Sequence, residues 1–311
     1  MAYITFQPKD HFTTKLYTGN GGNQTITGVG FQPDFAWFKS RDANNSHALV
    51  NSVLGTTKVL YTDTSGAETT ISAQTFNGDG YALVQDAGAN SINSNGSSKV
   101  AWNWKAGTTS GLSGGTITPS GYSFNATSGF SIIKYVGNST QGATVPHGLG
   151  AAPKMIIIKS SSHGEQWVIG HNRINPTNSW DYYLHFTTGS AGQNNNRFGN
   201  VYPTSTLFTL GSEDQVNGNK TYIALCFAEK KGFSRIGSYI GNGNASGPMI
   251  YTGFKPAWTL IKESSDTGES WVIHDNKRST GNMVNEILSP NSSYQEEGNH
   301  STKGLDFYAN G

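Results

Sequence analysis

Charged side chains are scarce in this sequence, and the usual signs of several protein classes are missing with them. Asp, Glu, Lys and Arg make up 13% of the 311 residues, and the formal net charge is +1. That share is about half of what globular proteins carry. No long run of Lys and Arg occurs, so the sequence has no concentrated positive charge that would attract nucleic acid or an anionic membrane. We therefore expect no nucleic-acid partner.

Cysteine and long apolar runs are almost absent as well. The single Cys226 excludes an intrachain disulfide and a cysteine zinc cluster, and its apolar neighbours predict a buried, unreactive thiol. No apolar stretch approaches the ~18 residues of a membrane-spanning helix. The opening MAYITFQPKD lacks the apolar core of a secretion signal. We expect no membrane insertion.

The sequence is instead rich in turn formers and aromatic rings. It holds 39 glycines, 12% aromatic residues and many Asn, Ser and Thr. Short β-branched and aromatic runs such as FAWF, MIIIK, WTLIK, WVIGH and YIALCFA are separated by turns such as GNGG and NGDG. No segment keeps a helical period over 12 residues. This pattern predicts an all-β protein made of many short strands.

Three segments of the chain share one pattern. They are KLYTGNGGNQTITGVGFQPDFAWFKS at 15–40, KYVGNSTQGATVPHGLGAAPKMIIIKS at 134–160 and SYIGNGNASGPMIYTGFKPAWTLIKE at 238–263. A Tyr-x-Gly-Asn core recurs in each, and each ends in a proline-led apolar run that stops at a lysine. The similarity continues downstream, where EQWVIGHNR at 165–173 matches ESWVIHDNKR at 269–278. Such self-similarity indicates repeated structural units.

The repeats predict tandem antiparallel β-sandwich units, jelly-roll or lectin-like, of roughly 100 residues each. Unit one spans 1–107, a Gly/Ser/Thr-rich linker spans 108–127, unit two spans 128–230 and unit three spans 231–311. Unit three lacks the final strands that units one and two have. Either the sequence is part of a longer protein, or another segment, such as the N-terminal YITF, supplies those strands by strand addition.

No motif for catalysis or metal binding is present. The eight histidines show neither HxH nor HExxH spacing, and no GxSxG or phosphate loop occurs. Glu165 and Glu269 hold the same repeat position, where a structural role is favoured over a pair of glycosidase carboxylates. We expect a protein that is not an enzyme and that needs no metal and no cofactor.

Aromatic residues without a counterpart in the other units are the best candidates for ligand binding. They lie in the unit-two stretch NPTNSWDYYLHF, where rings beside Asn and Asp could stack on a sugar while the polar groups bond its hydroxyls. The alternatives are a satellite core under a loop or an inter-subunit contact. The predicted glycan-binding residues are Asn178, Trp180, Asp181, Tyr182 and Tyr183, with His163 and Glu165 as second choices.

Several stretches resemble one known group of proteins. They are MAYITFQPKDHFTTKLYTGNG, GVGFQPDFAWFKSRD, VAWNWKAG, HGLGAAPKMIIIK, YIALCFAEKKGFSRIGSYIGNGNASGP and YTGFKPAWTLIK. Together they are similar to the repeat-containing virion structural proteins, or tail-fibre-like proteins, of tailed bacteriophages, particularly marine ones, which carry a domain of uncharacterised function. The resemblance implies a virion component made in the host cytoplasm, and it implies no catalytic residue.

The leading hypothesis from the sequence is a non-enzymatic virion surface protein, fibre-like or spike-like, that attaches to host surface glycans. Its expected partners are further copies of itself in a homo-oligomer, other virion proteins and host polysaccharide. A second hypothesis is a capsid decoration protein that acts only by self-association and docking, with the turns at 19–22 and 241–243 at subunit contacts. A third is a polysaccharide-binding or depolymerising enzyme, which needs paired carboxylates in a cleft.

Overall fold

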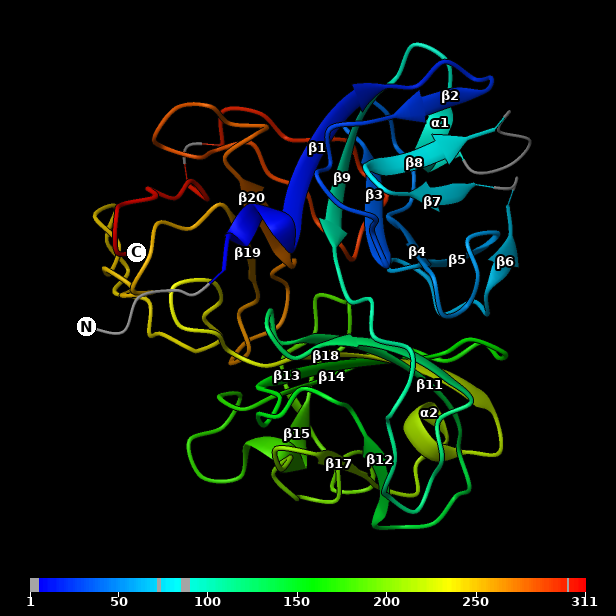
Figure 1. The fold of residues 1–311 in the computed structure, drawn as a ribbon. Coiled ribbons are helices and arrows are strands. Elements are labelled where there is room, and N and C mark those ends of the chain that lie inside the picture. Colours follow the sequence, from blue (N-terminus) through cyan, green and yellow to red (C-terminus); the bar gives the residue numbers. More distant parts are fainter. Residues whose placement is uncertain (1–5, 72–73, 85–89, 301) are drawn as a thin grey trace.

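The structure is a computed structural model that describes residues 6–311 apart from 72–73, 85–89 and 301. The described residues form an all-β protein with several antiparallel sheets, none of them closed (Figure 1). Its α-helices are the single turns α1 (Asn90–Asn93) and α2 (Asp214–Asn217), within the part of the chain that is described. The all-β prediction is confirmed, since apolar runs such as FAWF, MIIIK and WTLIK lie in strands.

Unit one consists of two facing sheets. The larger sheet has the order β1 (Phe12–Thr18), β9 (Ser98–Trp104), β3 (Phe35–Ser40), β4 (Ala48–Asn51), β5 (Lys58–Tyr61) and β6 (Thr69–Thr70). The smaller has the order β2 (Gln24–Ile26), β8 (Gly80–Leu83) and β7 (Thr75–Asn77). Because side chains alternate along a strand, Ala36 and Phe38 pack toward the smaller sheet, and Phe35 and Trp37 point the other way.

Unit two repeats this strand order. Its main sheet contains β10 (Gly121–Asn125), β11 (Phe130–Val136), β18 (Thr221–Phe227), β13 (Met155–Ser160) and β14 (Val168–His171). The order β11-β18-β13-β14 matches β1-β9-β3-β4, strand for strand, with the strands aligned by the sequence repeat. Two small ribbons complete the unit, β12 (Ala143–Pro146) with β17 (Leu207–Leu210) and β15 (Tyr182–Tyr183) with β16 (Gly192–Gln193).

The segment at 108–127 is packed rather than a free linker. Its second half forms β10, which pairs with β11 and extends the unit-two sheet. Ile117 is buried in the apolar cluster between the main sheet of unit two and the β12–β17 ribbon. The backbone amide groups of Thr108 and Phe124 each donate to the carbonyl of the other. Its Gly and Ser residues supply turns, and three of its glycines lie at positive φ.

The Tyr-x-Gly core of the repeat has a packing reason in units one and two. The hydroxyl groups of Tyr17 and Tyr135 donate to the carbonyls of Ile92 and Val216, in the single-turn helices. Gly19 is required because a Cβ there would lie 2.3 Å from the carbonyl oxygen of Ser94. In unit two a Cβ on Gly137 would similarly lie 2.2 Å from the Gly218 carbonyl. The motif thus holds the helical turn that leads into β9 or β18.

Unit three contains one hairpin, β19 (Trp258–Ile261) with β20 (Val272–Asp275), within its described residues. These strands correspond to β3–β4 and β13–β14 in the repeat. The remainder is held by single bridges, such as Val284 with Leu305 and Ile287 with Glu297. The Asn282–Met283 peptide bond is cis.

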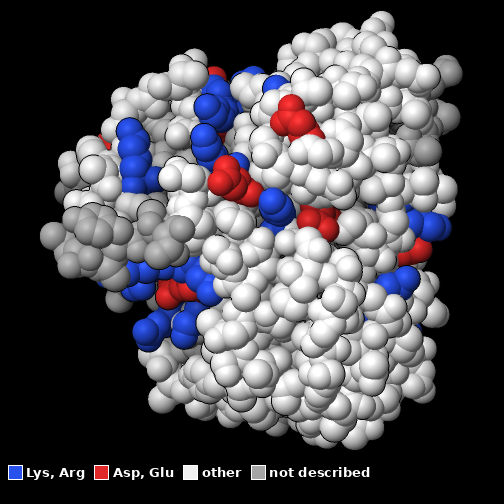
Figure 2. Space-filling view, in the orientation of Figure 1, with Lys and Arg blue, Asp and Glu red and all other residues white. Residues whose placement is uncertain are grey.

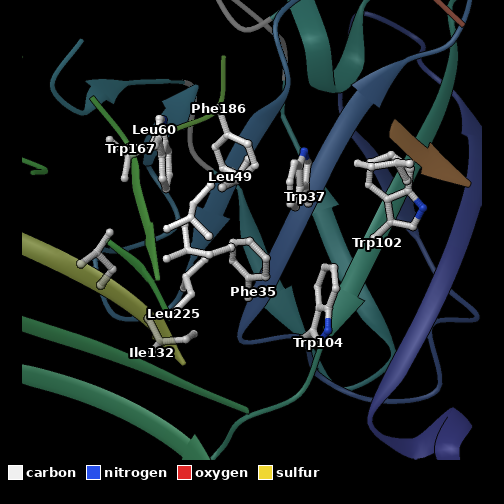
Figure 3. Close-up of a cluster of buried hydrophobic side chains, with 14 of the residues drawn as sticks. Phe35, Trp37, Leu49, Leu60, Trp102, Trp104, Ile132, Trp167, Phe186 and Leu225 are labelled. Atoms are coloured by element: carbon white, nitrogen blue, oxygen red, sulfur yellow. The ribbon is translucent and has the colours of Figure 1, made fainter. Parts of the chain in front are cut away.

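The three units share one apolar core. Alternate residues of the main sheets of units one and two point into it, and unit three adds Trp271, Ile273 and Leu288 from its hairpin region. Figure 3 shows part of this core, in which Phe35, Leu49 and Leu60 of unit one lie close to Ile132, Trp167 and Leu225 of unit two. The sequence repeats predict a separate core in each unit. The structure has, in addition, one core that the three units share.

The same backbone hydrogen bond joins each unit to the next and closes a ring. The acceptor is always the carbonyl of the residue two positions after the lysine that ends each repeated apolar run, Lys39, Lys159 or Lys262. The amides of Glu68, Ala191 and Glu296 donate to the carbonyls of Ser161, Ser264 and Arg41, over 2.8, 2.9 and 2.8 Å respectively. Unit one thus bonds to unit two, unit two to unit three, and unit three back to unit one. The units are related by an approximate threefold arrangement around the shared core.

A second set of equivalent contacts supports this symmetry. The indole of Trp167 in unit two donates to the Tyr61 carbonyl of unit one over 2.8 Å. The indole of Trp271 in unit three donates to the His185 carbonyl of unit two, also over 2.8 Å. His47 occupies the same repeat position in unit one and faces the backbone of Ser289 in unit three. Two of the three interfaces therefore carry an indole hydrogen bond from this repeat position, and the His47 imidazole lies at the third.

Candidate functional site

The predicted glycan-binding stretch of unit two is only partly accessible. Trp180 is 1% exposed and packs edge-on against Phe198, with ring centroids 5.3 Å apart. Tyr183 lies beneath the Arg197 guanidinium, 4.0 Å from its ring centroid. Asn178 is exposed, while Asp181 and Tyr182 are half-buried. Asp181 accepts a 2.6 Å hydrogen bond from Gln193. The structure brings only part of the predicted set to the surface.

Trp180 is a core residue, which corrects its interpretation as a sugar platform. Its ring lies over Gly170, where a Cβ would come within 2.6 Å of the indole. The same repeat position holds the buried side chains of Val50 in unit one and His274 in unit three. Trp180 lacks a counterpart because it fills the space that a side chain fills in the other units. The glycine at position 170 was the sequence signal for this role.

Replacing Trp180 with Ala is expected to lower the free energy of unfolding by about 3–5 kcal/mol, because a large buried ring is lost. Gly170→Val placed in the same variant should restore part of this loss, because the vacated space takes up the new side chain and lets the Phe198 ring, 2.7 Å from the added Cβ, move aside. Gly170→Val alone should destabilise by about 1–3 kcal/mol through overpacking. Denaturation in urea measures all three variants. Strictly additive losses in the double variant would contradict the proposed packing.

The second-choice residues and the paired glutamates are held by other side chains. Glu165 bonds to Lys220 over 2.7 Å, and Glu269 lies 3.4 Å from Lys303. His163 is exposed, and its ring lies 2.9 Å from the Ser162 hydroxyl. Within the described residues no group of three His, Cys, Asp or Glu side chains could hold a metal ion.

The buried titratable groups have structural partners. Cys226 is fully buried as predicted, and burial raises the pKa of its thiol to about 12. The ammonium groups of Lys39 and Lys159 are buried at the ends of β3 and β13, and burial lowers their pKa values to about 8. Each donates to the carbonyl of the following residue and to that of a loop residue four positions on. They fasten the strand ends at equivalent places in two units, which indicates a structural role.

A polar pocket of about 370 Å³ lies where unit three begins on the surface of unit two. It is lined by Lys154, Asn172, Arg173, Glu229, Arg235, Ile236, Gly237 and Ser238. Its carboxylate, Glu229, accepts from the Ile236 amide over 2.7 Å and lies 3.6 Å from Arg235. The side chains of Lys154 and Arg173 have no carboxylate partner among the described residues. The pocket therefore carries a net positive charge.

The sequence analysis missed this pocket, because its residues come from both sides of a unit boundary. The stretch EKKGFSR at 229–235 was a usable signal, since four charged residues in seven are unusual in this chain. Figure 2 shows charged residues gathered on one side and along the junctions between the units on this face. The surface over β12, β15 and β17 is nearly uncharged in that view.

The fold and the pocket describe an all-β protein with repeated units, and none of the helices in its described part could span a membrane. Comparison with known protein families identifies the family of the chain. Residues 7–311 match the family described as Domain of unknown function (DUF7483), and the chain belongs to that family. No curated protein and no solved structure matches it.

Proposed function

We propose that this chain is a non-enzymatic surface protein of a bacteriophage particle, built from tandem β-sandwich units, that attaches the particle to acidic glycans on the host. The virion assignment rests on the sequence resemblance. The glycan assignment rests on one observation, the cation-lined pocket between units two and three. A pocket of about 370 Å³ has the size of small-ligand sites, and its polar lining suits a sugar with a carboxylate or sulfate group.

The ring of units supports this proposal through rigidity. Lys154 directly precedes β13, and Asn172 and Arg173 directly follow β14, whereas Arg235 belongs to unit three. Contacts such as the Trp271–His185 hydrogen bond hold the two units together without a ligand. A preformed pocket loses less conformational freedom on binding than a pocket that must be assembled.

Replacing both Arg173 and Arg235 with Gln is expected to weaken binding to an acidic polysaccharide by about tenfold or more, because charge-assisted hydrogen bonds are lost. Binding to a neutral polysaccharide should not change. The matched control is Lys9→Gln with Lys277→Gln, which removes the same charge from exposed positions outside the pocket. Equal binding by both double variants would contradict the pocket assignment.

The virion assignment has its own test. Gold-tagged antibody against this chain should label the tail or its fibres on intact particles. Label spread over the head would instead support a decoration protein, and absence of label from particles would overturn the virion proposal. Release of new reducing ends from acidic polysaccharide by the purified protein would overturn the non-enzymatic part.

A further inference from the structure

The pocket between units two and three has a filled counterpart between units one and two. Asp34 directly precedes β3 as Lys154 directly precedes β13, so the two hold one repeat position. The backbone amides of Ser52 and Asn172 donate to the carbonyls of these two residues, over 2.8 and 2.9 Å respectively. The carboxylate of Asp34 is buried and accepts from the hydroxyls of Ser52 and Ser123. Because Ser123 belongs to β10, that strand lies over the first junction.

The connection between units two and three is too short to form a strand like β10. Only 228–238 separate the end of β18 at Phe227 from Tyr239 of the repeat core. Within this connection the Ser234 amide donates to the Lys230 carbonyl over 2.9 Å, and the Lys230 amide donates to the Ser234 hydroxyl over 3.0 Å. Local hydrogen bonds therefore fix this wall of the pocket, and the place that β10 covers at the first junction stays open at the second.

The open pocket offers a hydrogen-bond acceptor as well as cations. Lys154 and Arg173 supply charged donors. The Glu229 carboxylate accepts from the Ile236 amide through Oε1, and its Oε2 lies 3.6 Å from Arg235, which is beyond hydrogen-bond distance. Oε2 has no hydrogen-bond donor among the described residues. A ligand that satisfies this pocket must therefore bring an anionic group for the cations and a donor for Glu229.

Asn172 provides a second acceptor in the lining. Its side-chain oxygen is buried and has no hydrogen-bond donor among the residues that the structure describes. An unpaired buried polar atom is unfavourable by about 1–3 kcal/mol. Ser52, its counterpart in unit one, is instead paired with the Asp34 carboxylate. A hydroxyl group of a bound ligand can supply the donor that Asn172 lacks.

We propose that this pocket binds one residue of a hexuronic acid, a sugar with a carboxylate and free hydroxyl groups. The inference rests on the proposed function, because it names the ligand class of the same pocket. Lys154 and Arg173 bind the carboxylate, and Glu229 accepts from a hydroxyl group. A carboxylate is favoured over a sulfate ester because the counterpart junction holds a carboxylate, that of Asp34. A fully ionised inorganic anion has acceptors only, so it leaves Glu229 unpaired and is repelled by it.

Glu229→Gln is expected to change the affinities for two ligands in opposite directions. The variant keeps an oxygen for the Ile236 amide, but its other terminal atom becomes a donor instead of an acceptor. It should bind an oligosaccharide of hexuronate residues about tenfold more weakly, because a hydrogen bond to a charged group is lost. It should bind inorganic sulfate at least about threefold more tightly, because a like charge is removed. Calorimetric titration of the full chain measures both affinities.

A second glutamate of unit two provides the matched control. Glu165 pairs with Lys220 outside the pocket, so Glu165→Gln should leave both affinities unchanged. Tighter binding of both ligands by Glu229→Gln would overturn the inference, because the carboxylate would then only repel anions. Unchanged binding of both would also overturn it.

A sulfated oligosaccharide without carboxylates tests the choice of acid group. The original chain should bind it at least about threefold more weakly than the hexuronate oligosaccharide. Equal or tighter binding would overturn the carboxylate assignment. The double variant Arg173→Gln, Arg235→Gln separates this inference from the proposed function. If it loses affinity for acidic polysaccharide while Glu229→Gln loses none, the glycan pocket stands and the hexuronate inference fails. If it loses none, the pocket itself is not the glycan site.

Discussion

Acidification from pH 7 to pH 5 is expected to lower the free energy of unfolding by about 4 kcal/mol through His147 and His274. Burial lowers the pKa of each imidazole to about 4, whereas the unfolded chain titrates near 6.5. Between these values the unfolded chain binds protons that the folded chain does not. Stability is therefore complete above about pH 6.5 and falls as the pH drops toward 4.

The hydrogen bonds of His147 explain why its ring stays neutral. Its Nδ1 accepts from the Leu149 amide and its Nε2 lies 3.2 Å from the Thr204 carbonyl, which assigns the proton to Nε2. A second proton would place two donors face to face at Nδ1. Burial also lowers the pKa of His47 at the interface of units one and three, which adds to the same acid sensitivity.

Urea denaturation at several pH values measures this effect. In the double variant His147→Gln, His274→Gln, the difference in stability between pH 7 and pH 5 should be smaller by about 4 kcal/mol. The remaining difference comes from other buried imidazoles such as His47 and His171, whose pKa values burial also lowers. His163→Gln, at an exposed position, should leave the difference unchanged. A flat profile in the original chain would show that these imidazoles are not buried in solution.

Arg278→Met is expected to lower the free energy of unfolding by about 3–5 kcal/mol, because it leaves a buried carboxylate uncompensated. The side chains of Arg278 and Asp275 are both fully buried and lie 2.5 Å apart. Arg278 also bonds to Glu296 over 2.7 Å, and Asp275 accepts from the Trp102 indole of unit one over 3.0 Å. Glu296 in turn pairs with Arg41, so this network joins unit three to unit one.

Two further variants separate the pair from the packing around it. Adding Asp275→Asn to Arg278→Met should recover part of the lost stability, because the unpaired charge is removed. Lys58→Met breaks a partly exposed pair with Glu68 and should change stability by less than about 1 kcal/mol. An Arg278→Met effect as small as that of Lys58→Met would contradict the burial of the network.

The sequence predicted the strands and their recurrence, because these follow from local patterns. The apolar runs that end at Lys39, Lys159 and Lys262 each form a strand in an equivalent place. Trp102 and Leu225, which hold the same repeat position, are both buried in the shared core. The N-terminal YITF, considered as a completing strand, lies almost wholly outside the described residues.

The contacts between units could not be predicted in the same way. The bond between Glu296 and Arg41 joins residues at opposite ends of the chain, and no periodic pattern encodes such a pair. Trp180 was misread for a related reason. Its missing counterpart suggested a ligand, but comparing Gly170 with Val50 and His274 would have shown the vacant volume that the indole fills. A repeat is best read for compensating changes as well as for matches.

The ring of bonds from Glu68 to Ser161, Ala191 to Ser264 and Glu296 to Arg41 has the symmetry of a cyclic trimer. Each contact joins one surface of a unit to a different surface of the next unit, and three such contacts form a closed ring. Three separate copies of a one-unit ancestor could therefore have made the same assembly before duplication and fusion joined them. Fusion fixes the order of the three positions, so each can diverge alone, as unit two has done at Gly170.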